Sequence, residues 1–191
     1  MKTFELKGIV RTDLGKKATK AVRVKGSVPC ELYGGDKNVH FEVTNSDIRK
    51  LIYTPSIYLV ALDIEGQKVD AIMKQIQFHP VTDKVIHIDF VQVFPTKPII
   101  MEVPVHLEGL AEGVKAGGKL SLEVRKLRIK ALAKFIPESL TINVDQLELG
   151  KTIQVKALQF ENLEILNAPN SVVCAVKLTR AARGAAATSG K

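Results

Sequence analysis

The stretch Ile86-His87-Ile88-Asp89-Phe90 alternates apolar and polar side chains without a break. Successive side chains of a β-strand point to opposite faces, so His87 and Asp89 share one face. We expect Ile86, Ile88 and Phe90 to point into a core on the other face, which leaves the polar pair at the surface. The stretch therefore predicts a strand that carries a candidate functional pair.

The same two-residue period recurs on both sides of this stretch, and it predicts a mostly-β chain. Helical signals are few. The polar residues 45–47 precede a short helical pattern that ends before Pro55, and residues 15–25 predict one or two further helical turns. The alternating runs are Phe4-Leu6, Val39-Phe41-Val43, Tyr58 to Ile64, Val69-Ala71-Met73, Leu127-Ile129-Ala131, Leu140-Ile142-Val144, Ile153-Val155 and Val172 to Leu178.

The length of 191 residues allows one large domain or two small ones. Pro95 and Pro98 interrupt the alternating pattern between two strand-rich halves, which favours a boundary there. We predict one domain over residues 1–94 and a second over residues 95–179. Residues 180–191 lack the apolar content to pack and are predicted to form a flexible basic tail.

The charge of the chain is uneven. Lysine and arginine total 28 against 20 acidic residues, which gives a net charge of +8. Seven basic side chains lie between Lys7 and Lys25, with Asp13 as the one acid among them. Such a segment can be an ordinary solvated face, but its concentration favours a surface that attracts a polyanion such as nucleic acid.

Sequence features of other protein classes are weak. The longest apolar run has six residues, too short to cross a membrane, and no export signal precedes the first strand. We therefore expect a cytoplasmic protein with no membrane partner, in which Cys30 and Cys174 stay reduced.

The candidate catalytic motifs also lack residues that their chemistry requires. The segment 113–120 nearly matches a phosphate-binding loop, but Leu120 stands where a hydroxyl must ligate magnesium, so we interpret it as a glycine-rich turn. The four histidines lack the spacing of metal ligands, so neither a metal nor a cofactor is predicted. We predict that the chain is not an enzyme. His87 and Asp89 fit recognition best, while an ordinary surface pair and a catalytic pair with Cys30 remain alternatives.

An ordered set of residues resembles bacterial large ribosomal subunit protein twenty-five, in the long two-domain form known as the general stress protein CTC type. In the first half the matching residues are Arg11, Gly15-Lys16, Arg23, Gly26, Val28-Pro29, Tyr33-Gly34, Gln77, His79-Pro80 and His87 to Phe90. In the second half they are Val105, Gly109, Gly113 to Lys115, Gly117-Gly118, Pro137, Val144-Asp145, Leu147 and Gly150.

The resemblance implies a small N-terminal β-barrel with short helices that binds 5S ribosomal RNA at loop E from the minor-groove side. A second mostly-β domain would follow, for which contact with a neighbouring ribosomal protein of the large subunit and contact with RNA are both left open. Thr19 replaces a frequent serine, and Ala21 stands where a basic residue is frequent. An RNA-binding stress-response module acting outside the ribosome is the alternative. By position, the RNA-contacting residues would be Arg11, Lys16, Thr19, Lys20, Arg23, Tyr33, Gln77, His87 and Asp89.

Overall fold

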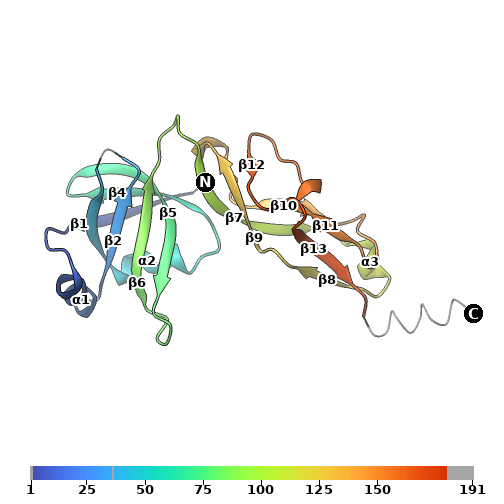
Figure 1. Cartoon of the computed structure of the whole chain (residues 1–191), viewed down its shortest axis with the longest axis horizontal. Coiled ribbons are helices and arrows are strands. Elements are labelled where there is room, and N and C mark those ends of the chain that lie inside the picture. The colour runs from blue at the N-terminus through green and yellow to red at the C-terminus, as the bar shows by residue number, and fades with distance from the viewer. Residues whose placement is uncertain (1, 36, 180–191) are drawn as a thin grey trace, which may run out of the picture. The chain divides into compact units, whose positions relative to one another are not determined.

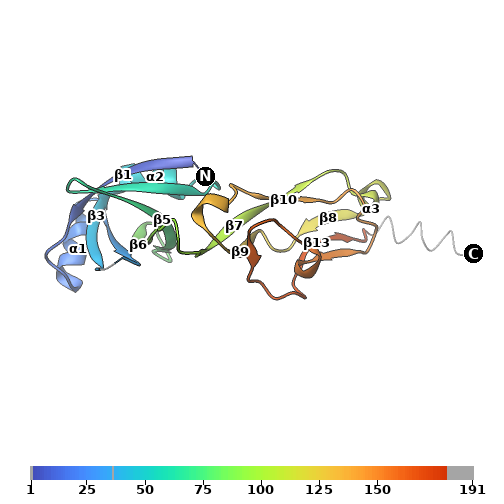
Figure 2. The ribbon, with the colours of Figure 1, turned by 90° about the horizontal axis from the view of Figure 1, so that it is seen from above.

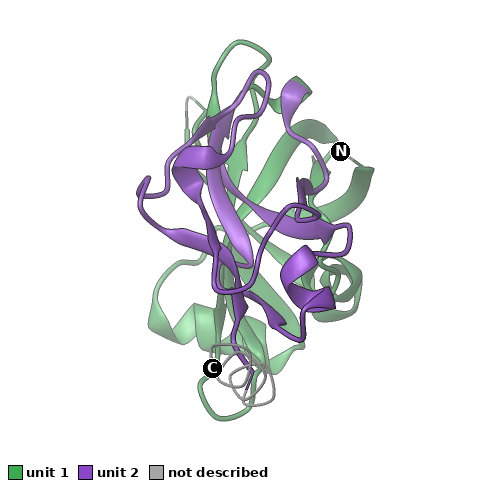
Figure 3. Ribbon diagram, turned by 90° about the vertical axis from the view of Figure 1, so that its right-hand side faces the viewer, with its two compact units in different colours: residues 1–99, 132–134 green, residues 100–131, 135–191 purple. Residues whose placement is uncertain are grey.

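The computed structural model describes residues 2–35 and 37–179, so the predicted tail at residues 180–191 lies outside the described residues. The chain forms two compact units (Figures 1 and 3). Of the described residues, the first contains 2–35, 37–99 and 132–134, and the second contains 100–131 and 135–179. Both are built mainly from strands, which confirms the predicted mostly-β fold class.

The first unit is a closed six-stranded barrel. Its closing contact is the parallel pairing of β1 with β4, in which Lys2 lies opposite Tyr58 and Gly8 opposite Ile64. The strands follow each other around the barrel as β1 (Lys2–Val10), β3 (Val39–Thr44), β2 (Ser27–Tyr33), β6 (Val85–Gln92), β5 (Gln67–Phe78) and β4 (Tyr58–Ile64).

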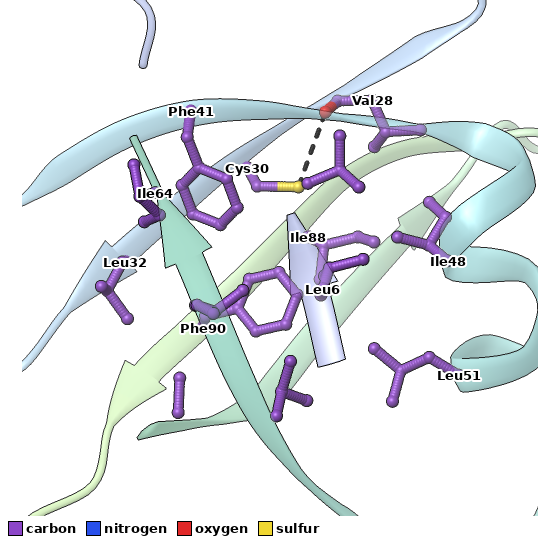
Figure 4. Close-up of a cluster of buried hydrophobic side chains, with 14 of the residues drawn as sticks. Leu6, Val28, Cys30, Leu32, Phe41, Ile48, Leu51, Ile64, Ile88 and Phe90 are labelled. Atoms are coloured by element: carbon purple, nitrogen blue, oxygen red, sulfur yellow. Dashed lines mark hydrogen bonds between the residues drawn. The ribbon is translucent and has the colours of Figure 1, made fainter. Parts of the chain in front are cut away.

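The barrel core is formed by the apolar side of the alternating strands (Figure 4). Phe41 and Phe90 are fully buried, and their ring centroids lie 5.7 Å apart. Cys30 lies in the same core, where its thiol donates to the carbonyl of Val28 (3.5 Å). Gly8 faces the ring of Phe41, and a Cβ at this glycine would lie 2.6 Å from ring atom Cδ2. The core therefore selects glycine at that position on β1.

Two short helices accompany the barrel. Helix α1 (Lys16–Val24) packs against β2 and buries Val22. Helix α2 (Asn45–Ile52) packs against β3 and β1, beside which it is seen in Figure 2, and buries Ile48 and Leu51. Both helices were expected from the sequence. The N-cap of α2 is Thr44, one residue earlier than the predicted capping segment.

The second unit contains two further sheets. Its buried side chains include Ala111, Val144, Leu147, Cys174 and Val176. A short helix, α3 (Glu112–Lys115), occupies part of the glycine-rich segment that was predicted as a plain turn. One sheet has the order β10 (Leu140–Asn143), β7 (Ile99–Glu108), β9 (Lys126–Ala131) and β12 (Glu164–Ile165). The other has the order β11 (Thr152–Gln154), β13 (Val172–Lys177) and β8 (Lys119–Leu122). The 3-10 turn η2 (Val155–Ala157) also belongs to this unit, whereas the turn η1 (Ala133–Phe135) begins in residues that belong to the first unit.

Candidate nucleic-acid interface

The outer face of β6 carries the polar pair that the alternating pattern predicted. His87 Nδ1 and Asp89 Oδ1 lie 2.7 Å apart, and the side chains are 26% and 24% exposed. Within the described residues, Nδ1 is buried and has no partner in hydrogen-bond geometry. The two groups thus lie in contact without the alignment of a hydrogen bond, and both side chains remain partly exposed and open to a ligand.

The neighbouring strands add polar side chains to this face. Gln77 of β5 lies opposite His87, while Gln75 of β5 and Glu31 of β2 lie on either side of Asp89. Gln77 was predicted from the sequence. Gln75 and Glu31 were not predicted. Gln75 lies two positions before Gln77, which places both side chains on the same face of β5, and the pairing of β5 with β6 brings that face beside His87 and Asp89. Together these five residues form what we term the polar face.

Tyr33 lies at the end of β2 beside the polar face. It is half-buried and is opposite Val91, two residues beyond Asp89 on β6. Partial burial raises the pKa of the Tyr33 phenol, and the charges of Asp89 and Glu31 raise it further. The hydroxyl is therefore a neutral donor at physiological pH, and the aromatic ring offers a surface for a base or a sugar.

Arg23 connects α1 to the beginning of β6. Its Nε and Nη2 atoms both donate to the carbonyl of Ile86, at 3.0 and 2.8 Å. The strand is irregular here, because Gln77 pairs with His87 whereas Phe78 pairs with Val85. Ile86 is thus the extra residue of a β-bulge, and its carbonyl is left to a side-chain donor.

The bulge corrects one sequence prediction. Ile86 is only half-buried, and Val85 occupies the core in its place. An extra residue shifts the alternation by one position, so the residues before and after the bulge follow different phases. Ile88 and Phe90 are fully buried as predicted.

Arg11 and Thr19 lie together at the other end of α1. Arg11 Nη2 donates to Thr19 Oγ1 (3.4 Å) and to the carbonyl of Asp13 (3.2 Å). The Thr19 hydroxyl donates to the carbonyl of Gly15 (2.8 Å). These contacts hold the loop that precedes α1 against the helix, so both residues stabilise the local structure of the protein.

Lys16 and Lys20 are exposed on α1, one helical turn apart. Within the described part of the chain they have no hydrogen-bond or ion-pair partner, so their ammonium groups are available to an anion. The nearby Lys17 is also exposed. The residues predicted from the sequence thus lie on or beside two surfaces. One is the cationic helix α1, and the other is the polar face. Arg23 joins the two through its contact with Ile86 at the beginning of β6.

Other candidate groups show no catalytic arrangement. Burial raises the pKa of the Cys30 thiol well above its usual range, and the charge of Asp89 adds to this effect. A buried, protonated thiol is a poor nucleophile, which removes the catalytic pairing of Cys30 with His87. Nδ1 of His79 accepts from the amides of Val81 and Thr82, and this side chain thereby shapes the turn between β5 and β6.

The described residues contain no helix of the length and apolarity that a membrane span requires. Among the same residues, no three His, Cys, Asp or Glu side chains gather as a metal site would need.

Comparison with known proteins gives a consistent result over the whole chain. The model of the ribosomal L25p family matches residues 6–90, and that of the C-terminal domain of ribosomal protein TL5 matches residues 98–180. The chain belongs to the ribosomal L25p family. Family membership confirms the predicted two-domain form and the prediction of a structural, non-enzymatic protein.

Curated relatives share this full length. The large ribosomal subunit protein bL25 of Bacteroides fragilis is 60% identical and covers 100% of both chains. The proteins of the same name from Bacteroides thetaiotaomicron and Porphyromonas gingivalis are 59% and 61% identical. They cover 100% of both chains in the first case, and 97% of this chain and 98% of the relative in the second.

Proposed function

We propose that this protein is a structural component of the large ribosomal subunit and that its barrel binds 5S ribosomal RNA. The proposed site is the minor-groove side of loop E. Support comes from the resemblance of the site residues to the family pattern and from the names of the full-length relatives, which are large-subunit proteins. A ribosome-associated, cytoplasmic location follows from this assignment.

The observation that carries the proposal is the placement of free cations beside a polar strand face. Lys16 and Lys20 are exposed on α1, and Arg23 ties the same helix to β6 next to His87. Phosphate contacts position a protein on RNA, whereas contacts to base edges and 2′-hydroxyls discriminate one site from another. The helix supplies the first kind of contact and the polar face supplies the second.

The acidic members of the polar face favour specific recognition over plain charge attraction. Asp89 and its neighbour Glu31 would repel a phosphate backbone. A carboxylate accepts hydrogen bonds from base amino groups and ribose hydroxyls, and those donors line the shallow minor groove of structured RNA. We therefore assign Asp89, with Tyr33, Gln77 and His87, to base or sugar contacts.

The second unit has a different electrostatic character. Residues 98–179 contain ten basic and nine acidic side chains, so the cationic excess of the chain lies outside them. A nearly neutral surface gains little from phosphate neutralisation. We propose that this unit contacts neighbouring ribosomal proteins and adds little to 5S RNA affinity.

The test is the affinity of the full chain for a 5S ribosomal RNA fragment that contains loop E, between 50 and 200 mM salt. Two to four phosphate contacts predict a log–log slope of about −1.8 to −3.6, or roughly a 12- to 150-fold loss of affinity over this range. Lys20→Gln should make the slope shallower by about one, while Lys126→Gln on β9 should leave it unchanged. A flat response, or equal affinity for an unrelated duplex, rejects the proposal.

The same titration tests the division of the chain. Residues 1–94 alone should fold and keep most of the affinity. A fragment that is unfolded, or that has lost most of its binding, would reject the boundary at residues 94 and 95. Co-sedimentation of the full chain with large subunits separates the ribosomal role from a stress-response role outside the ribosome.

A further inference from the structure

Helix α1 has little intrinsic stability. It contains nine residues, fewer than the roughly 12–15 that an isolated helix needs in water. Gly15 at its N-cap provides no side-chain hydrogen bond, and its first turn contains no acidic residue. Lys16 and Lys17 instead place positive charge at the positive end of the helix dipole. The helix must therefore be held by contacts with the barrel.

The contact of Arg23 with the bulge is one such contact. Its two donors reach a single carbonyl of a strand 63 residues away in sequence, and the β-bulge leaves that carbonyl to a side chain. Val22, the preceding residue, is the buried apolar anchor of the helix. Helix α1 thus packs against β2, with Val22 buried, and Arg23 ties it to the beginning of β6.

We propose that Arg23 is a positioning residue whose bond to Ile86 holds α1 in place, so that Lys16 and Lys20 meet phosphates while the polar face meets base edges. This proposal rests on the proposed RNA-binding function. It departs from a direct phosphate role for Arg23, because two of its nitrogen donors are already bonded to the Ile86 carbonyl at the protein surface. The β-bulge thereby becomes part of the binding site, although its backbone need not touch RNA.

Arg23→Lys is the informative variant, because it keeps the charge but cannot place two N–H groups on one carbonyl. In the free full-length protein, amide hydrogen exchange of α1 should become about tenfold faster, since loss of a charge-assisted hydrogen bond favours local opening. Exchange at Ile88 and Phe90 of β6 should be unchanged. Lys17→Gln, on the same helix, is the matched control and should not accelerate exchange.

RNA binding supplies the second measurement. Arg23→Lys should weaken binding to the loop E fragment about tenfold and make the salt slope shallower by about one to two, although the net charge is unchanged. A purely structural residue remote from the phosphates would not change that slope. Lys20→Gln should cost less in the Arg23→Lys background than in the wild type, because Lys20 is then already poorly placed.

The outcomes are distinct. Wild-type exchange and wild-type affinity in Arg23→Lys would overturn the positioning role. Weaker binding with unchanged exchange, or additive effects with Lys20→Gln, would also overturn it and assign Arg23 to direct RNA contact. Absence of loop E binding by the wild-type chain would reject the proposed function itself, while the exchange measurement would still decide whether Arg23 holds the helix.

Discussion

Replacement of Asp89 by alanine separates directed recognition from simple charge attraction. The carboxylate is about one quarter exposed, and Glu31 lies beside it across the strand pair, so this part of the surface is locally negative. Removing one negative charge should strengthen RNA binding if electrostatics alone mattered. For a phosphate about 8 Å away in water the gain is about 0.5 kcal/mol, and salt reduces it further.

The opposing effect is larger. A directed contact to a base edge contributes about 1–3 kcal/mol of discrimination. Asp89 also lies 2.7 Å from His87 Nδ1, so its loss removes a group in contact with the imidazole. We therefore predict a net loss of about 1–2 kcal/mol, or roughly 5- to 30-fold in affinity. Stability should change by less than about 0.5 kcal/mol, because the pair is on the outer face.

The assay is binding of the loop E fragment at fixed salt, with folding checked by thermal unfolding. Asp89→Asn is the control, since it removes the charge but keeps one acceptor and the shape; it should bind with intermediate affinity. His87→Ala should weaken binding to a similar extent, and the double variant should lose less than the sum. Unchanged or tighter binding by a folded Asp89→Ala protein would refute the reasoning and make the pair ordinary surface.

Two further predictions concern the barrel core. Gly8→Ala should destabilise the protein by about 1–3 kcal/mol, because its Cβ would lie 2.6 Å from the Phe41 ring; thermal unfolding measures this, and Phe41→Leu in the same chain should recover part of the loss. Cys30 should react with a thiol reagent far more slowly in the native than in the unfolded protein at pH 8, because burial raises its pKa. Rapid native labelling would contradict that assignment and reopen a reactive role for the thiol.

Strands with one solvent-facing side were readable from the sequence, whereas others were not. The run Tyr58 to Ile64 alternates, and it forms β4. β2 was missed because its alternation is short and is interrupted at Pro29, which is buried although it lies on the outer face. Helix α1 packs against this strand, and an apolar residue under a helix obscures the period of two. In β7, Pro104 similarly obscured a ten-residue strand.

By itself the sequence determined the mostly-β class, the cationic segment that includes α1, and the placement of His87 and Asp89 on one face. These depend on neighbours within a few positions, where strand geometry is local. Only the tertiary structure decided that Ile86 leaves the core and that Arg23 bonds its carbonyl. The bulge, the strand register and the packing of the helix all depend on contacts between residues that are far apart in sequence. A local period in the sequence does not indicate which distant strand a residue contacts.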